Sequence, residues 1–183
     1  MVLDEMILQN KGSEANILVT QPRRISAIGV SERIASERCE KLGQTCGYSI
    51  RLDSKRSDKT RLLLCTTGVL LRRLQCDPDL ASVSHVFVDE GKRSCLISAS
   101  HAGSSRSSVI VHERDLNTDF LLIILKDLLK RRPSLKLVLM SATLNAERFS
   151  EYFGGCPTVS IPGRAQVHKT SKSCGLLFSS YHS

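Results

Sequence analysis

Four short apolar runs constrain the fold of this 183-residue chain more than any other feature of its sequence. Each run is uninterrupted rather than alternating with polar residues, which is typical of strands that are covered on both faces of a parallel sheet. We therefore predict strands over residues 16–20, 61–66, 85–89 and 135–140.

Helical segments are predicted between these strands. Residues 26–42 and 68–75 mix apolar with charged positions, and leucine and isoleucine recur at helical spacing between residues 121 and 128. Pro133 ends this last helix. Because strand and helix alternate, the chain is predicted to form a three-layer α/β domain with right-handed crossovers. The length suffices for one ordinary domain of this kind.

Two stretches do not fit this alternation. Residues 91–110 are rich in serine and contain no acidic residue, and residues 165–183 are rich in serine and lysine. Both compositions are typical of solvated or disordered segments. We therefore expect one domain over residues 1–164, interrupted by an insertion at 91–110 and followed by a divergent tail. We hypothesise that both segments are translated non-coding sequence, which sequencing of the spliced transcript would test.

Two acidic residues, Asp89 and Glu90, end the third apolar run, and residues 111–115 read Val-His-Glu-Arg-Asp. Without the serine-rich insertion the sequence would be VFVDEVHERD, an unbroken Asp-Glu-x-His box at the end of a strand. At the carboxyl edge of a parallel sheet, side chains project into the crevice where α/β proteins bind phosphates. Taken alone, the two residues are more readily explained as a solvated turn after a core strand.

Further short motifs accompany this box in a fixed order. They are TQPRRISA at 20–27, GYSIR at 47–51, TTGVL at 66–70 and the Ser-Ala-Thr motif formed by Ser141, Ala142 and Thr143. With the box, they resemble the DEAH-box (Asp-Glu-x-His) RNA helicases over residues 2–164. The resemblance implies a RecA-like domain of the P-loop NTPase type, with ATP and Mg²⁺ as cofactors.

The resemblance also implies roles for the residues of the box. Asp89 would hold Mg²⁺ through its water shell, and Glu90 would orient and deprotonate the attacking water. His112 would link the nucleotide site to the Ser-Ala-Thr motif, so that hydrolysis is felt by the RNA-binding loops. A lone histidine before Glu-Arg-Asp is otherwise most often a surface residue.

A single RNA strand, contacted along its backbone, is the partner that the resemblance implies. The alternative for the arginines involved is that they are ordinary surface cations after a proline turn, and for the threonines that they cap a helix. Few aromatic residues are present, so a platform for stacking bases is not evident. The residues assigned to RNA are Arg23, Arg24, Arg51, Thr66, Thr67 and Gly68.

Composition constrains the partners and the compartment less strongly. The net charge of +8 suits a polyanion, but much of the excess lies in residues 91–110 and 168–183, so charge alone does not predict RNA binding. The seven cysteines are odd in number and form no Cys-x-x-Cys pair, which argues against a disulfide framework or a zinc site. The sequence has no apolar stretch of membrane-spanning length, and Asp4 and Glu5 lie close to Met1, so we expect a cytoplasmic or nuclear location. We also expect a monomer, with protein activators as further partners.

A Gly-x-x-x-x-Gly-Lys-Ser/Thr phosphate loop, which NTPases of this class need, is not found in the sequence. In the family this loop directly precedes the helix to which residues 2–9 correspond. We therefore expect the chain to begin just after it, without the first strand of the domain, and to bind nucleotide poorly. Two functions stay open: a segment of an ATP-dependent RNA helicase with impaired catalysis, or a non-catalytic remnant that binds RNA weakly or is inert.

Overall fold

The computed structural model describes residues 2–89, 116–140 and 150–159. The chain divides into two compact units, residues 1–144 and 145–183. Within the described part of the second unit, the Ser150 hydroxyl donates to the carbonyl of Cys156 (2.7 Å), and the rings of Tyr152 and Phe153 meet edge to face. The predicted insertion at 91–110 and the tail at 165–183 lie outside the described residues.

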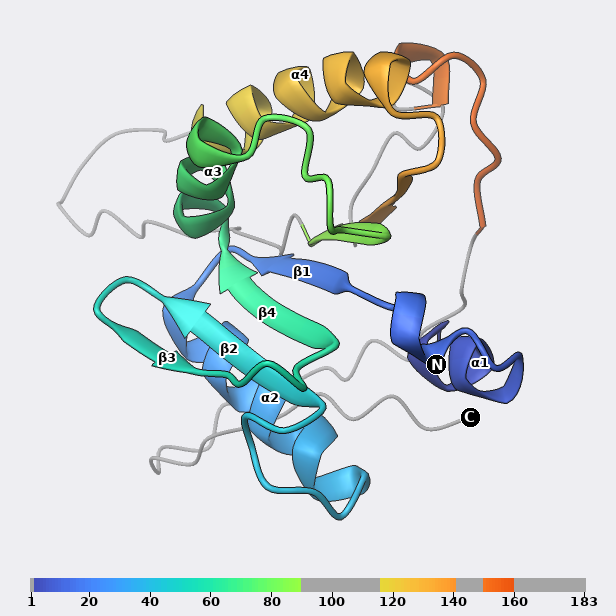
Figure 1. The fold of residues 1–183 in the computed structure, drawn as a ribbon. Helices are drawn as coiled ribbons and strands as arrows, with labels where there is room; N and C mark the ends of the chain where they lie inside the picture. The colour runs from blue at the N-terminus through green and yellow to red at the C-terminus, as the bar shows by residue number, and fades with distance from the viewer. Residues whose placement is uncertain (1, 90–115, 141–149, 160–183) are drawn as a thin grey trace, which may run out of the picture. The chain divides into compact units, whose positions relative to one another are not determined.

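One six-stranded sheet, of strand order β3-β2-β4-β1-β5-β6, forms the centre of the first unit (Figure 1). All neighbouring strands are parallel except β3, which is antiparallel to β2. The mostly parallel α/β architecture predicted from the apolar runs is therefore confirmed. The strands are β1 (Ile17–Gln21), β2 (Cys46–Ile50), β3 (Asp53–Lys55), β4 (Leu62–Thr66), β5 (His85–Asp89) and β6 (Lys136–Met140).

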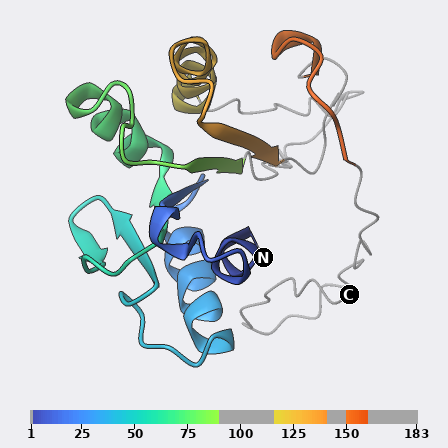
Figure 2. The ribbon, with the colours of Figure 1, turned by 45° about the vertical axis from the view of Figure 1, so that its right-hand side comes forward.

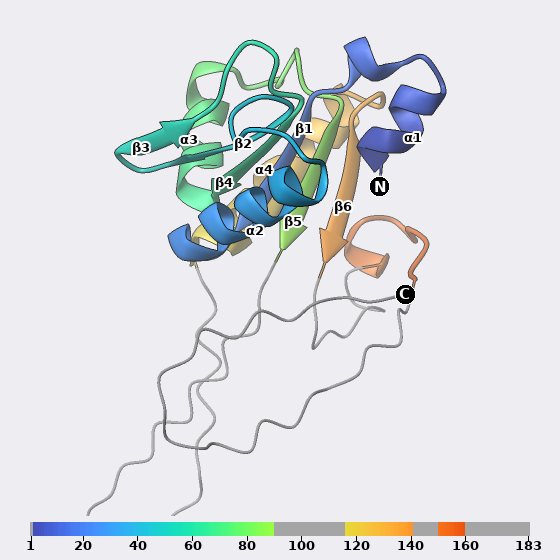
Figure 3. The same ribbon diagram turned by 90° about the horizontal axis from the view of Figure 1, so that it is seen from below.

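Helices cover both faces of this sheet. α2 lies on one face, whereas α3 and α4 lie on the other, as Figures 1 and 2 show from two directions. A view from below places α2 in front of the strands and α3 and α4 behind them (Figure 3). No helix in the described part of the chain is long and apolar enough to cross a membrane. The helices are α1 (Val2–Leu8), α2 (Arg24–Glu37), α3 (Thr67–Cys76) and α4 (Leu116–Arg131), with a 3-10 turn, η1 (Gly12–Glu14).

The core alternates between the two faces along each strand. Ile17 of β1 and Leu64 of β4 belong to a buried cluster with Ala27 of α2. On the other side, Leu121 and Leu125 of α4 are fully buried, as their helical spacing predicted. β6 differs from the central strands, because its residues alternate only between exposed and partly buried.

One predicted helix was too long, and one hairpin was not predicted. The helix predicted over 26–42 ends at Glu37, and Cys39 after it has a φ of 54°, a left-handed conformation that ends a helix. The hairpin of β2 and β3 was not predicted as strands. Its sequence mixes glycine, serine and charged residues, and β3 is exposed throughout, so no apolar run marks it.

Buried His85 at the start of β5 makes the stability of the domain depend on pH. The side chain is 8% exposed, its Nδ1 lies 3.0 Å from the Ser84 hydroxyl, and β5 pairs it with Lys136. Burial, and then the charge of Lys136, lower the pKa of His85 below its usual 6.5. The unfolded chain therefore takes up the proton first, so stability is lost as pH falls from 6.5 toward the lowered pKa.

We expect His85→Gln to lose less stability on acidification than the unchanged chain. Urea unfolding of both proteins at neutral and mildly acidic pH, followed by circular dichroism, measures the difference. Carboxylates elsewhere titrate in both proteins, so only the difference between them reports on His85. Equal losses would show that His85 is not held neutral by the fold.

Candidate functional site

Five strands of the sheet are parallel and end at one edge, here called the carboxyl edge. Arg51 follows β2, Thr66 ends β4, Arg23 comes just after β1, and Asp89 ends β5. The strand order places these residues along the edge in the order Arg51, Thr66, Arg23 and Asp89. Every predicted site residue within the described ranges therefore lies at or next to the edge where α/β sheets bind ligands.

A row of three polar side chains crosses the carboxyl edge on one face. Gln21 of β1 is in register with Thr66 of β4, and it lies one position beyond the Thr20–Val88 pair, next to Asp89 of β5. The side-chain amide of Gln21 donates to Asp89 Oδ2 at 3.1 Å. This contact is called the Gln21–Asp89 bond below. Gln21 is only 7% exposed, so the fold buries a polar group here together with its partner.

Asp89 stands where the sequence predicted it, as the last residue of a buried strand and on the same edge as Thr66. Its side chain is partly buried. Glu90, His112 and the Ser-Ala-Thr motif lie outside the described residues, although β6 ends at Met140, directly before that motif. Of the acidic box, the structure therefore places only the first carboxylate.

Two arginines mark the start of α2 at the carboxyl edge. Arg23 is the N-cap residue in an extended conformation, and Arg24 is the first helical residue; both are exposed. Arg23 makes no side-chain capping hydrogen bond among the described residues, and the first turn contains no acidic residue. Because a helix N-terminus carries partial positive charge, a cation here is unfavourable unless an anion is bound. Two exposed cations beside a partly positive helix end would attract a negatively charged ligand, and the alternative of ordinary surface cations stays open.

The start of α3 is similar. Thr66 occupies the N-cap position, as the alternative of a helix cap predicts. Its hydroxyl, however, makes no capping hydrogen bond. Thr67 is buried and Gly68 is exposed. A Cβ added to Gly68 would meet no atom within 4 Å, so the packing of the described residues does not require glycine. Among the described residues, therefore, the side chain of Thr66 does not satisfy the first N–H groups of α3.

A hydrogen-bonded hairpin holds Arg51 at the same edge. Arg51 and Leu52 form the two-residue turn between β2 and β3, and Leu52 is 95% exposed with a φ of 70°. The Tyr48 hydroxyl donates to Asp53 Oδ2 at 2.7 Å, and this hydrogen bond raises the pKa of Tyr48. The Ser54 hydroxyl donates back to the Tyr48 carbonyl at 3.2 Å. The left-handed backbone conformation of Leu52 was not predicted, because the pair Arg51-Leu52 contains no residue that is typical of a turn.

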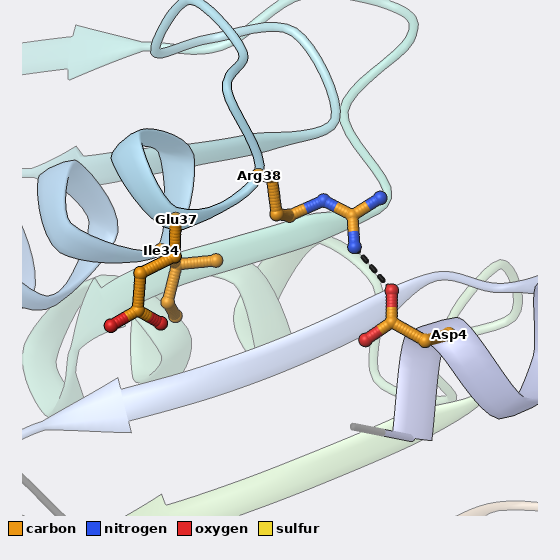
Figure 4. A pocket seen from close by; sticks show the side chains of 4 residues that line it. All are labelled: Asp4, Ile34, Glu37 and Arg38. Carbon is orange, nitrogen blue, oxygen red and sulfur yellow. Dashed lines mark hydrogen bonds and ion pairs between the residues drawn. The ribbon is translucent and has the colours of Figure 1, made fainter.

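A cavity of about 470 Å³ lies away from this edge, beside the C-terminal end of α2 (Figure 4). Arg38, which lines it, pairs with Asp4 of α1 and, at 3.2 Å, with Glu40. Burial alone would raise the pKa of Asp4, but the hydrogen bond and charge of Arg38 lower it. The arginine is thus engaged in joining α1 to α2, and the cavity is not part of the site.

Gln21 is the functional candidate that sequence reasoning missed. It belongs to the TQPRRISA motif, but no role was assigned to it. One signal was available in the sequence. Gln21 directly follows the run at 16–20 and precedes a proline, so it ends its strand as Asp89 ends β5. No group of three His, Cys, Asp or Glu side chains suitable for a metal occurs among residues 2–89, 116–140 and 150–159.

Comparison with known proteins identifies close relatives of this chain. No protein-family model matches it. It is 56% identical to the DExH-box ATP-dependent RNA helicase DExH1 of Arabidopsis thaliana over 162 residues. These residues make up 88% of the chain and 14% of that protein. It is 52% identical over 163 residues to the putative ATP-dependent RNA helicase DHX57 of Homo sapiens (89% and 10%), and 50% identical over 165 residues to the ATP-dependent DNA/RNA helicase DHX36 of Bos taurus (88% and 14%).

The chain thus spans between 10% and 14% of the length of these relatives. The matched part nevertheless takes in nearly nine tenths of the chain, and half or more of its residues are identical. The chain is therefore homologous to one segment of the DExH-box ATP-dependent RNA helicases.

Proposed function

We propose that this domain supplies the RNA-binding edge and the metal-binding carboxylates of an ATP-dependent RNA helicase of the DExH-box type. In this proposal the domain is the first RecA-like domain of the motor. The observation that carries it is the row of Thr66, Gln21 and Asp89 across three neighbouring strands at the carboxyl edge. The helix starts beside this row, of which that of α2 begins with two arginines, favour a phosphate-bearing ligand.

Asp89 fits a hydrated magnesium ion. A carboxylate is a hard oxygen donor, and Mg²⁺ keeps most of its water, so one or two carboxylates suffice and no larger cluster is needed. When bound, the ion would neutralise charge that develops on a phosphoryl group. Asp89 would hold the ion's water shell, and Glu90 would orient the attacking water. The sequence contains no phosphate loop, so no residue of this chain is assigned to the phosphates of ATP.

The RNA-binding part of the proposal uses the starts of α2 and α3. Phosphates of a single strand would accept hydrogen bonds from the free N–H groups there and pair with Arg23, Arg24 and Arg51. Glycine is a poor helix former, so Gly68, which packing does not require, is explained by close approach of a ligand. His112 and the Ser-Ala-Thr motif would relay the state of the nucleotide to this edge.

Arg24→Ala is expected to weaken binding of a short, fluorescein-labelled oligouridylate, because it removes a cation beside an uncapped helix start. Fluorescence anisotropy at several salt concentrations measures the effect. Each phosphate contact that is lost should reduce the slope of log affinity against log salt by about 0.7.

The matched control is Arg33→Ala. Arg33 is also an exposed arginine of α2, but it pairs with Glu37 at 2.6 Å in the second half of the helix. We expect this variant to bind the oligouridylate as the unchanged chain does. If the two substitutions weaken binding equally, the interaction follows overall charge and the proposed RNA-binding edge is wrong.

A further inference from the structure

Gln21 lies between the two halves of the proposed site. On one side it is in register with Thr66, which is proposed to contact RNA, and on the other its amide donates to Asp89, which is proposed to hold Mg²⁺. Because Gln21 is 7% exposed, water competes little for the Gln21–Asp89 bond. Gln21 therefore contributes to the orientation of the carboxylate, and its other strand neighbour, Thr66, is on the RNA side.

An amide suits this position chemically. It is neutral, so it fixes the orientation of the Asp89 carboxylate through one oxygen without cancelling the negative charge that a metal ion needs. A lysine or arginine in the same place would compete with the ion for the carboxylate. The partner that the fold provides is therefore of the kind that orients a metal ligand.

Gln21 is also connected to the start of α2 through a short piece of backbone. It is the last residue of β1, and Pro22 separates it from the N-cap residue Arg23. The ring of a proline fixes its φ, so one of the two backbone torsions that could absorb a movement of the helix start is removed there. A phosphate bound at Arg23 and Arg24 would thus act on Gln21 across a single residue.

We propose that Gln21 is a positioning residue, which orients the Asp89 carboxylate and makes its affinity for a divalent cation depend on RNA bound at the start of α2. This inference rests on the proposed function of the carboxyl edge. By thermodynamic linkage, the cation and the RNA change each other's affinity by the same factor.

The test uses the whole chain labelled with ¹⁵N, with Mn²⁺ as the cation and an oligouridylate as the RNA. Mn²⁺ is paramagnetic, so on binding at Asp89 it broadens the side-chain amide signal of Gln21. We expect this broadening, and we expect saturation with RNA to change the Mn²⁺ affinity measured at Gln21 about fivefold. The internal control is Gln9, whose amide donates at 2.9 Å to an exposed carboxylate, Glu5. Equal broadening of both signals would mean adventitious binding to carboxylates and would overturn the inference.

In Gln21→Met, which keeps the length of the side chain but has no donor, the effect of RNA on the Mn²⁺ affinity, read from backbone amides around Asp89, is expected to vanish. Gln21→Asn, one methylene shorter, is the second variant if the first does not fold. An unchanged chain that binds RNA but shows the same Mn²⁺ affinity with and without it overturns the inference and leaves the proposed function intact. A chain that does not bind the oligouridylate overturns both.

Discussion

Gly47→Ala is expected to destabilise the domain by about 3 kcal/mol, at the upper end of the usual cost of overpacking. A Cβ at this position would lie 2.3 Å from the carbonyl oxygen of Lys55 and 3.3 Å from its carbonyl carbon. Both are backbone atoms of β3, so no side-chain rotation relieves the clash. Because β2 is hydrogen-bonded to β4 on its other side, Gly47 cannot retreat without disturbing the sheet.

Urea unfolding followed by circular dichroism measures this loss. Gly68→Ala is the matched control, since a Cβ there meets no atom within 4 Å and alanine favours a helix by about 1 kcal/mol. The control should unfold at the same urea concentration as the unchanged chain or at a higher one. A loss of less than about 1 kcal/mol in Gly47→Ala would show that β3 does not approach β2 as closely as described.

Arg132→Met is expected to cost about 2 kcal/mol, within the range for hydrogen bonds from charged donors. Arg132 follows α4, and its guanidinium donates to the carbonyls of Asp79 (3.0 Å), Leu80 and Val83 (3.4 Å) in the loop between α3 and β5. Leu80 in this loop is fully buried and has a φ of 45°, so the loop depends on such contacts to hold its conformation.

The neighbouring Arg131→Met is the control for this substitution. Arg131 pairs with the carboxylates of Asp79 and Asp127, but all three side chains are largely exposed, and such surface pairs contribute at most about 1 kcal/mol. We expect chemical denaturation to rank Arg132→Met well below Arg131→Met in stability. The same loss in both variants would mean that the loop carbonyls do not need the guanidinium.

The central strands could be predicted from sequence because burial on both faces forces them to be continuously apolar. β5 was predicted at 85–89, as observed, and with it the position of Asp89 at the edge of the sheet. β2 and β3 could not be found in this way, because neither is a continuous apolar run. β2 contains Gly47 where the backbone of β3 comes close, and β3 is exposed throughout. Such an approach depends on tertiary packing and leaves no periodic pattern.

The candidate site was predictable to the extent that it depends on strand ends. A residue that ends an apolar run must lie at the carboxyl edge once the sheet is parallel, which was enough for Asp89 and Thr66. The Gln21–Asp89 bond depends on the register between two strands that are 68 positions apart in sequence, and periodicity says nothing about register. The roles of Glu90, His112 and the Ser-Ala-Thr motif stay predictions.

The two outer strands of the described sheet differ in their tendency to recruit another chain. β3 presents three exposed polar or charged residues, which is how natural sheets prevent aggregation at an open border. β6 is longer and mostly apolar, with Val138 and Met140 38% and 36% exposed. Among the described residues, β6 is therefore the outer strand with less protection against pairing with a further strand.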